Sequence, residues 1–299
     1  MRELERSLED LDFCLVGPGK VGTSLASWLV AGGARARAVA GRPGSLAARA
    51  LASQLGAEAS ELEELPTGCG LLLVAVPDPA LDSVAKRLAE RESAAVALHA
   101  SGSRDGRALA PLAARGTAVG SWHPLRAFPR ALDSPGSSAG TVFGVDGEPA
   151  ALALAQRLSA AVGGRAVLVP AASRRTYHLA ATLAAGGVVT LLALGQELVR
   201  QAGLPEELLA GYLSLAQGAL AEVEKLGEPL GAATGPVVRG DAGTVLAALA
   251  EVAGRDAELA GFVARLGAAT LELLRRQQGL SETQRALAGK LAAFLEERA

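Results

Sequence analysis

Residues 12–22 read DFCLVGPGKVG, and this stretch decides the fold. A short apolar run leads directly into three glycines spaced as GxGxxG, and the residues that follow have the apolar periodicity of an amphipathic helix. Glycines at these places permit a tight turn, let the backbone approach a pyrophosphate, and leave free N–H groups at a helix N-terminus. The alternative is an ordinary tight turn. We expect a dinucleotide site at the residues Gly17, Pro18, Gly19, Lys20, Val21 and Gly22.

Residues 1–170 continue the pattern that this stretch begins. Short apolar runs alternate with segments of helical periodicity, which is typical of βαβ units in a mostly parallel, doubly wound sheet. The expected strands are residues 12–16, 35–40, 70–76, 94–99, 117–120, 141–145 and 165–169. The expected helices between them are residues 20–31, 45–55, 79–91 and 149–161.

From Ala172 onward the strand-like alternation disappears, and long helical segments follow one another. The last of them has its own start signal, because Ser281 and Gln284 have the spacing of a capping box. We therefore expect an α/β Rossmann domain over residues 1–170, followed by an all-α domain over residues 171–299.

Composition and charge argue against several kinds of partner. The formal net charge is -2, and acidic and basic residues are mixed along the chain, so we expect no nucleic acid partner. The two cysteines, Cys14 and Cys69, lie in apolar runs without the further ligands that a metal needs. We expect both to be reduced core residues, and we expect no metal site and a cytoplasmic protein.

Residues 179–195 are an apolar stretch without any charge. The stretch is at the short end of what can span a bilayer, and it contains two threonines and two adjacent glycines. We expect a fully buried helix and no membrane. Because so few helices are available in this domain to enclose it, we also expect a homodimer whose interface comes mostly from residues after Ala172.

The end of the second expected strand indicates which dinucleotide is bound. NAD enzymes place an acid there for the ribose 2′-hydroxyl, whereas this chain has Arg42 and Ser45, which can hold a 2′-phosphate. NADP(H) is therefore expected, the alternative for Arg42 being an ordinary solvated loop residue. After residues 70–76, the backbone of Val76 and Pro77 should border the nicotinamide ribose, and Asp78 is expected to be the N-cap of the next helix.

Four further motifs follow the glycine loop: HASG at residues 99–102, HPLRAF at 123–128, YH at 177–178 and TGPVVRGD at 234–241. In this order, and over nearly the whole chain, the set resembles a family of oxidoreductases with a Rossmann-like domain followed by a helical domain of unassigned function. That family is similar in turn to ketopantoate reductase, pyrroline-5-carboxylate reductase and the 6-phosphogluconate dehydrogenase group.

The resemblance implies a Rossmann domain, use of NADP(H), and a dimer formed through the helical domain, but it implies no particular substrate. Members often carry Asn eight residues after the histidine of the Tyr-His motif, where this chain has Gly186. That difference puts in doubt any substrate contact made by the Asn side chain.

All three histidines of the chain lie in these motifs. Reduction of a carbonyl or imine by hydride also needs a proton, and histidine is the usual donor near neutral pH. We expect His178 to be the donor, on one helix face with Thr182 and Gly186, and His123 to be the second candidate. His99 is expected beside the cofactor. For each histidine the alternative is a buried ring whose nitrogens bond the backbone.

Three other side chains complete the expected site. Ser101 could offer its hydroxyl to nicotinamide or substrate, or could cap a helix. Arg126 and Arg239 could hold a substrate carboxylate by paired hydrogen bonds, or Arg239 could form a structural pair with Asp241.

The function expected from the sequence is hydride transfer to or from a small oxo acid or an imine. A lysine-based mechanism like that of ketopantoate reductase is not supported, because no lysine stands beside Tyr177 and His178. The alternative function is a dinucleotide-binding sensor or regulatory dimer without turnover.

Overall fold

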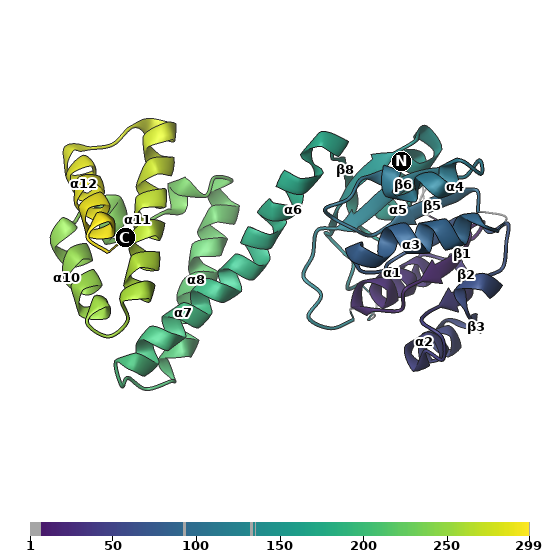
Figure 1. Ribbon diagram of the computed structural model, residues 1–299, viewed down its shortest axis with the longest axis horizontal. Helices are drawn as coiled ribbons and strands as arrows, with labels where there is room; N and C mark the ends of the chain where they lie inside the picture. Colours follow the sequence, from purple (N-terminus) through teal and green to yellow (C-terminus); the bar gives the residue numbers. More distant parts are fainter. Residues whose placement is uncertain (1–6, 92–93, 132–133, 135, 299) are drawn as a thin grey trace. The chain divides into compact units, whose positions relative to one another are not determined.

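The computed structural model describes residues 7–91, 94–131, 134 and 136–298, and the chain divides into two compact units, residues 1–185 and 186–299 (Figure 1). The division falls inside a helical segment, whereas the sequence placed its domain boundary at Pro170.

The first unit is built on one sheet of eight strands, in the order β3-β2-β1-β4-β5-β6-β7-β8. The strands are β1 (Asp12–Val16), β2 (Arg35–Ala40), β3 (Glu58–Ser60), β4 (Leu71–Val74), β5 (Val96–His99), β6 (Ala118–Pro124), β7 (Val142–Gly147) and β8 (Arg165–Leu168). Neighbouring strands are parallel except β6 and β7, which pair antiparallel with Pro124 opposite Phe143. The mostly parallel sheet that the sequence predicted is confirmed.

Helices pack against both faces of this sheet. The helices of the first unit are α1 (Lys20–Ala31), α2 (Leu46–Leu55), η2 (Leu62–Glu64), α3 (Asp78–Ala89), η3 (Gly106–Leu109), α4 (Ala110–Ala113), α5 (Pro149–Ala161), η4 (Ala171–Ser173), α6 (Arg174–Thr182) and η5 (Leu183–Gly187), which continues into the second unit. The predicted bounds of β1, β2, α1 and α5 are confirmed. The sequence missed β3, because this edge strand is three residues long and has no buried side chain.

Strand β1 shows how the sheet separates two cores. Phe13 and Leu15 pack in one cluster with side chains of α1, α2 and α5, while Cys14 and Val16 pack in a second cluster with α3 and η3. This alternation is the consequence of strand geometry, in which successive side chains point to opposite faces. Cys14 and Cys69 are both free and buried, as the sequence predicted.

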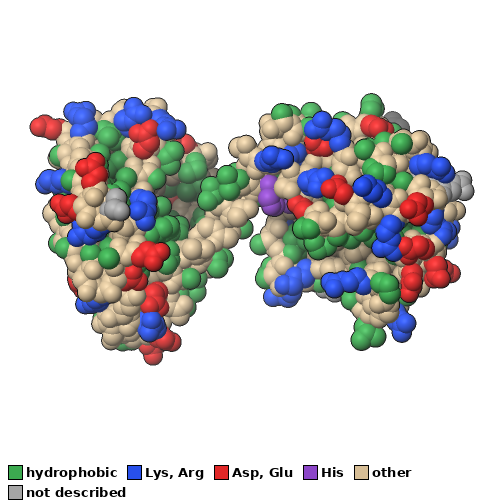
Figure 2. All heavy atoms as spheres, viewed as in Figure 1, with side chains coloured by type: hydrophobic (Ala, Val, Ile, Leu, Met, Phe, Trp, Pro, Cys, Tyr) green, Lys and Arg blue, Asp and Glu red, His purple; other side chains and the backbone are tan. Residues whose placement is uncertain are grey.

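The second unit is helical throughout its described residues. Its elements are α7 (Val188–Gln201), α8 (Leu208–Leu226), η6 (Leu230–Ala232), α9 (Pro236–Arg239), α10 (Ala242–Ala253), α11 (Ala257–Gln278) and α12 (Glu282–Glu296). The core lies mainly among α10, α11 and α12. The predicted capping box at Ser281 and Gln284 is present at the start of α12. On the face that Figure 2 shows, basic and acidic side chains are interspersed over both units.

The expected burial of residues 179–195 is wrong for the single chain. None of these residues is buried, and Leu179, Leu183 and Val189 are 60%, 65% and 66% exposed. The helical segment Ala171–Gln201 that contains them is long and apolar enough to cross a membrane. High hydropathy predicted enclosure by the chain's own helices, but the second unit buries the faces of α10, α11 and α12 against one another instead.

Candidate active site

Each glycine of the GxGxxG loop suits its position for a different structural reason. Gly17 has φ +99°, and a Cβ there would lie 2.5 Å from the Ala75 carbonyl oxygen. A Cβ on Gly22 would lie 2.0 Å from the Gly17 carbonyl oxygen, so this glycine lets α1 pack against the turn. A Cβ on Gly19 would meet no atom within 4 Å, so the space above the loop is open. Gly19 is also the N-cap of α1 and offers no side-chain cap, which leaves N–H groups for an anion.

A first cavity of about 570 Å³ opens at the carboxyl ends of β1 and β2. Its lining includes Gly17, Gly19, Arg42 and Ser45, four residues that the sequence assigned to the cofactor. The Ser45 hydroxyl accepts a hydrogen bond from the Ala48 N–H as the N-cap of α2, so its own proton remains free to be donated. We call this space the glycine-loop cavity.

The far wall of the glycine-loop cavity holds an ion pair that sequence reasoning missed. Arg87 of α3 donates from Nε to Oε1 of Glu63 over 2.7 Å, and both side chains are exposed. The Arg87 guanidinium holds the pKa of Glu63 below its usual value. Because the partners come from two separate segments of the chain, their spacing in the sequence carried no signal.

A second cavity of about 530 Å³ adjoins the first, and we call it the histidine cavity. The two share Gly19, Ala75, Val76 and Pro77 in their linings. An extended ligand can therefore run past the glycine loop from one cavity into the other. The predicted residues that line the histidine cavity are Gly19, Lys20, Val21, Val76, Pro77, Ser101, His123, Arg126 and His178.

The rings of His123 and His178 converge on Gly102. A Cβ on this glycine would lie 2.7 Å from Nε2 of His123 and 2.5 Å from Nδ1 of His178, and the ring centroids are 6.0 Å apart. Among the described residues, Nδ1 of His178 has no hydrogen-bond partner although it is buried. A buried polar atom without a partner is unusual, and it marks a place where a bound molecule can complete the hydrogen bonding. Figure 2 shows histidine (purple) at the surface of the first unit.

His123 is held neutral by its surroundings. Burial, together with the nearby His178 and Arg174, lowers the pKa of His123 to about 4. Its Nδ1 lies 2.8 Å from the hydroxyl of Tyr177, whose own pKa is raised by burial. At neutral pH the pair is thus an uncharged imidazole and an uncharged phenol that share one hydrogen bond.

His99 has a different environment from the other two histidines. It is fully buried, and burial lowers the pKa of its ring. The Ser101 N–H donates to Nδ1 over 3.2 Å, so Nε2 carries the proton and donates to the Asp105 carbonyl over 2.9 Å. Both nitrogens therefore bond the backbone, and the ring shapes the turn after β5.

Ser101 lies in the turn after β5 and does not cap a described helix, because the N-cap of the next helix, η3, is Asp105. The Ser101 hydroxyl oxygen accepts a hydrogen bond from the Arg104 N–H over 3.2 Å, and the residue also lines the histidine cavity. The hydroxyl also hydrogen-bonds the Asp78 carboxylate and helps to lower the pKa of that carboxyl.

The expectation that Asp78 caps α3 is wrong. Pro77 is the N-cap, Asp78 is the first helical residue, and its carboxylate accepts a hydrogen bond from the Ser103 hydroxyl. Asp78 also lines the histidine cavity. The carboxylate, and not only the backbone, therefore belongs to the site.

Sequence reasoning also missed Arg174, a buried arginine that holds several elements of the site together. This arginine is 1% exposed, and it donates from Nε to Asp146 over 2.9 Å and from Nη2 to the Ser121 hydroxyl. The second oxygen of Asp146 accepts from the Gly106 N–H over 2.9 Å. The guanidinium also lies 5.7 Å from the ring centroid of Tyr177. This network joins β6, β7, the segment after β5 and α6 behind the two histidines.

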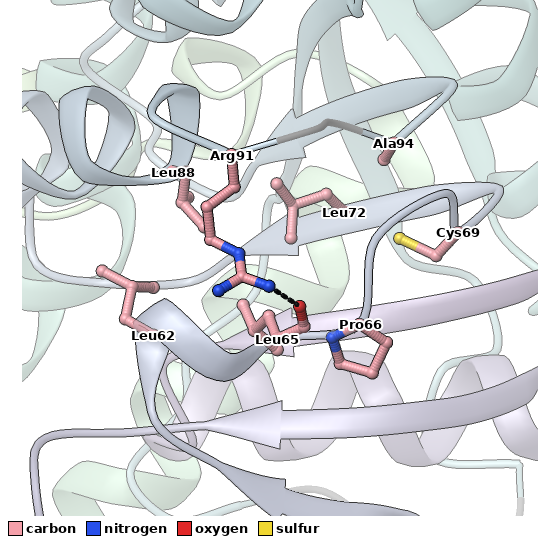
Figure 3. A pocket seen from close by; sticks show the side chains of 8 residues that line it. All are labelled: Leu62, Leu65, Pro66, Cys69, Leu72, Leu88, Arg91 and Ala94. Carbon is pink, nitrogen blue, oxygen red and sulfur yellow. Dashed lines mark hydrogen bonds between the residues drawn. The ribbon is translucent and has the colours of Figure 1, made fainter.

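A third cavity lies apart from this chemistry (Figure 3). It measures only about 20 Å³, and its lining is apolar apart from Arg91, which donates to the Leu65 carbonyl over 3.3 Å, and the Cys69 thiol. A space of this size holds about one water molecule, so it is not a ligand site.

Two family models match the chain in succession. A model described as a Rossmann-like domain matches residues 5–124, and a model described as a domain of unknown function, DUF2520, matches residues 141–270. The chain joins a Rossmann-like domain to a DUF2520 domain. The family resemblance inferred from the sequence motifs is thereby confirmed.

Solved structures with a similar fold cover nearly the whole chain. A Bacteroides fragilis protein named "putative NADP oxidoreductase" is 25% identical, covers 95% of this chain and 100% of its own, and has a TM-score of 0.69. A Thermotoga maritima protein is 23% identical, with coverage of 96% and 100% and a TM-score of 0.68. An imine reductase from Myxococcus stipitatus in complex with NADP+ is 18% identical, with coverage of 95% and 99% and a TM-score of 0.64. No curated protein sequence matches the chain.

The DUF2520 match also includes Arg239, Asp241 and Gly186, which the sequence analysis singled out. Arg239 ends α9 in the second unit, and Asp241 accepts hydrogen bonds from the backbone and side chain of Thr244 as the N-cap of α10. Among the described ion pairs, none joins Arg239 to Asp241. Gly186 lies in the π-helical turn η5 and is exposed.

Proposed function

We propose that this Rossmann-like and DUF2520 protein is an NADP(H)-dependent oxidoreductase that transfers hydride to or from a small oxo acid or an imine. The observation that carries the proposal is the pair of adjoining cavities, one at the glycine loop and one lined by His123 and His178. The Bacteroides fragilis protein, 25% identical over nearly the whole chain, bears the name of an NADP oxidoreductase, which supports the same function.

The residues present fit a dinucleotide. The N–H groups at the start of α1 would hold the pyrophosphate, and the open space over Gly19 would admit it. Arg42 and the Ser45 hydroxyl would hold the 2′-phosphate, while Val76, Pro77 and Ser101 would border the nicotinamide end. The bound cofactor supplies or accepts the hydride, and the protein supplies the positions and the proton.

His178 is the proposed proton donor. Its Nδ1 is not committed to another described residue, so the ring is free to hydrogen-bond a ligand. His123, with a pKa of about 4, does not act as an imidazolium at neutral pH. We assign it to orienting the substrate through Nε2 while Tyr177 holds Nδ1. Arg126, at the same cavity, is the proposed carboxylate contact, and Arg239 remains a second candidate.

Cofactor titration tests the assignment of Arg42. We expect NADPH to bind at least tenfold more tightly than NADH, because a guanidinium pairs with a 2′-phosphate that NADH lacks. Arg42→Asp should remove the preference. Arg49→Asp, on the neighbouring helix but outside the lining of the cavity, is the matched control and should keep it. Equal affinities of the unaltered protein for NADPH and NADH would refute NADP(H) selectivity.

A dinucleotide-binding sensor without turnover is the second candidate function. Gly186 favours it, because the family resemblance leads us to expect an Asn side chain at this position and the chain has none. NADPH oxidation with a panel of oxo acids and cyclic imines separates the two functions. Turnover of any panel member supports the oxidoreductase. NADPH binding without turnover across the panel supports the sensor.

We further propose a cytoplasmic homodimer that covers the exposed apolar side chains of the segment Ala171–Gln201. Light scattering at micromolar concentration is expected to give the mass of two chains. Val189→Asp should shift the protein toward monomer, because it places a charge in the interface. Leu46→Asp, at an exposed leucine of the first unit, should leave the dimer intact. A monomer, or association with lipid vesicles, would contradict this assembly.

A further inference from the structure

The histidine cavity contains one described carboxylate, that of Asp78, and no cation among the described residues pairs with it. The charge of Arg104 interacts with that of Asp78, but the Arg104 guanidinium forms its ion pair with Asp82. The Ser103 hydroxyl occupies part of the hydrogen-bonding capacity of Asp78. An ionised carboxylate can accept about four hydrogen bonds, so capacity remains for a ligand.

The carboxylate of Asp78 is ionised at neutral pH. Burial raises its pKa, but hydrogen bonds from Ser103 and Ser101 and the nearby His178 outweigh burial, so the net pKa lies below the usual value. Its position at the first residue of α3 also favours the negative charge, because a helix N-terminus carries a partial positive charge. Because His123 is neutral, the Asp78 carboxylate presents a negative charge to a ligand in the histidine cavity.

We propose that Asp78 recognises a protonated nitrogen at the reacting bond, so that the substrate is an imine, or in the reverse direction an amine, and not an oxo acid or an alcohol. The inference rests on the proposed function and narrows it. The carboxylate is complementary to C=NH⁺ and to a product ammonium.

The chemistry of the two substrate classes differs at this position. When a C=N bond is reduced, the carbon gains the hydride, the π pair moves to nitrogen, and one proton completes the amine while the nicotinamide is oxidised. Asp78 favours the protonated imine, which is the form that accepts hydride. When a C=O bond is reduced, negative charge develops on oxygen, and a site for that reaction places hydrogen-bond donors there. A carboxylate at the same place repels that charge.

Two cations also line the cavity, and they are compatible with this assignment. Lys20 begins α1, and Arg126 follows β6 and donates to the Thr141 hydroxyl over 3.1 Å. They suit an anionic arm of a ligand. A molecule with both a carboxylate and a protonated nitrogen is complementary to these cations and to Asp78, whereas an oxo acid is complementary to the cations alone.

The test compares amines with oxygen isosteres of nearly the same shape. In the presence of NADP⁺, calorimetry or histidine NMR shifts measure the affinities of proline against tetrahydrofuran-2-carboxylate, and of pyrrolidine against tetrahydrofuran. We expect each nitrogen compound to bind at least tenfold more tightly than its isostere. Asp78→Asn, which keeps the shape and an acceptor for Ser103, should remove the difference. Asp82→Asn, one turn later on α3 and outside the cavity lining, should retain it.

The outcomes separate this inference from the proposed function. If NADPH does not bind, the proposed function fails. If NADPH binds but the isosteres bind as well as the amines, if neither member of a pair perturbs the histidine signals, or if Asp78→Asn keeps the preference, the inference about Asp78 is overturned and the oxidoreductase assignment stands.

Discussion

Arg174→Met is expected to lower the free energy of unfolding of the first unit by about 3 to 5 kcal/mol, because removing one partner of a buried pair leaves the other charge uncompensated. Asp146 is 6% exposed, so water cannot replace the guanidinium. Both tryptophans of the chain, Trp28 and Trp122, lie in the core of the first unit, so their fluorescence during urea unfolding reports on this unit.

Two further variants test whether the unpaired charge of Asp146 causes the loss of stability in Arg174→Met. The double variant Arg174→Met with Asp146→Asn should recover much of the loss, because no charge then remains buried. Arg107→Met breaks an exposed pair with Asp105 and should change the unfolding midpoint little. A double variant no more stable than Arg174→Met would show that shape, and not charge, explains the effect.

His178→Ala is expected to lower turnover by about 10² to 10⁴ fold, the range for a lost general acid, while leaving NADPH affinity nearly unchanged. Gly102→Ala should lower turnover by a comparable factor although it leaves both rings in place, because its Cβ would lie within 2.7 Å of a nitrogen of each histidine and displace them. Steady-state rates and a separate NADPH titration measure the two effects.

The matched control is Gly289→Ala, at a helical glycine of α12 where a Cβ meets no atom within 4 Å. This variant should keep full turnover. His178 would instead be a structural residue if His178→Ala lost thermal stability and cofactor binding together, or if turnover on an identified substrate barely changed.

Local sequence patterns predicted those parts of the site whose residues are close together in the sequence. The glycine loop lies between β1 and α1. The bounds of β1 follow from a short apolar run, and those of α1 follow from the apolar periodicity of an amphipathic helix. The histidines could be placed at the sheet edge because the carboxyl ends of parallel strands meet there. Strand β3 was missed because its three residues, none of them buried, are too few to show a periodic pattern of apolar and polar side chains.

The remaining parts depend on contacts between distant segments. Asp78 has the local sequence of a helix cap, but its partner is Ser103, which lies in another loop. Arg174 looks like an ordinary surface residue in sequence, and only the folded positions of Ser121 and Asp146 make it a buried one. The exposure of Leu179 and its neighbours was also not predictable. Hydropathy indicates that an apolar surface is to be buried, but it does not indicate which other surface buries it.

The antiparallel pairing of β7 with β6 gives this protein a route for evolving new substrate specificities. Because β7 runs against β6, the chain leaves the sheet at Pro124 and re-enters it at Val142 on the same edge, and Arg126 and Phe128 of this connection line the histidine cavity. Insertions and deletions in a surface connection change loop-closure entropy only slightly. Descendants of one ancestral sequence can therefore lengthen, shorten or replace this wall of the cavity while the strand register and the glycine loop are inherited unchanged.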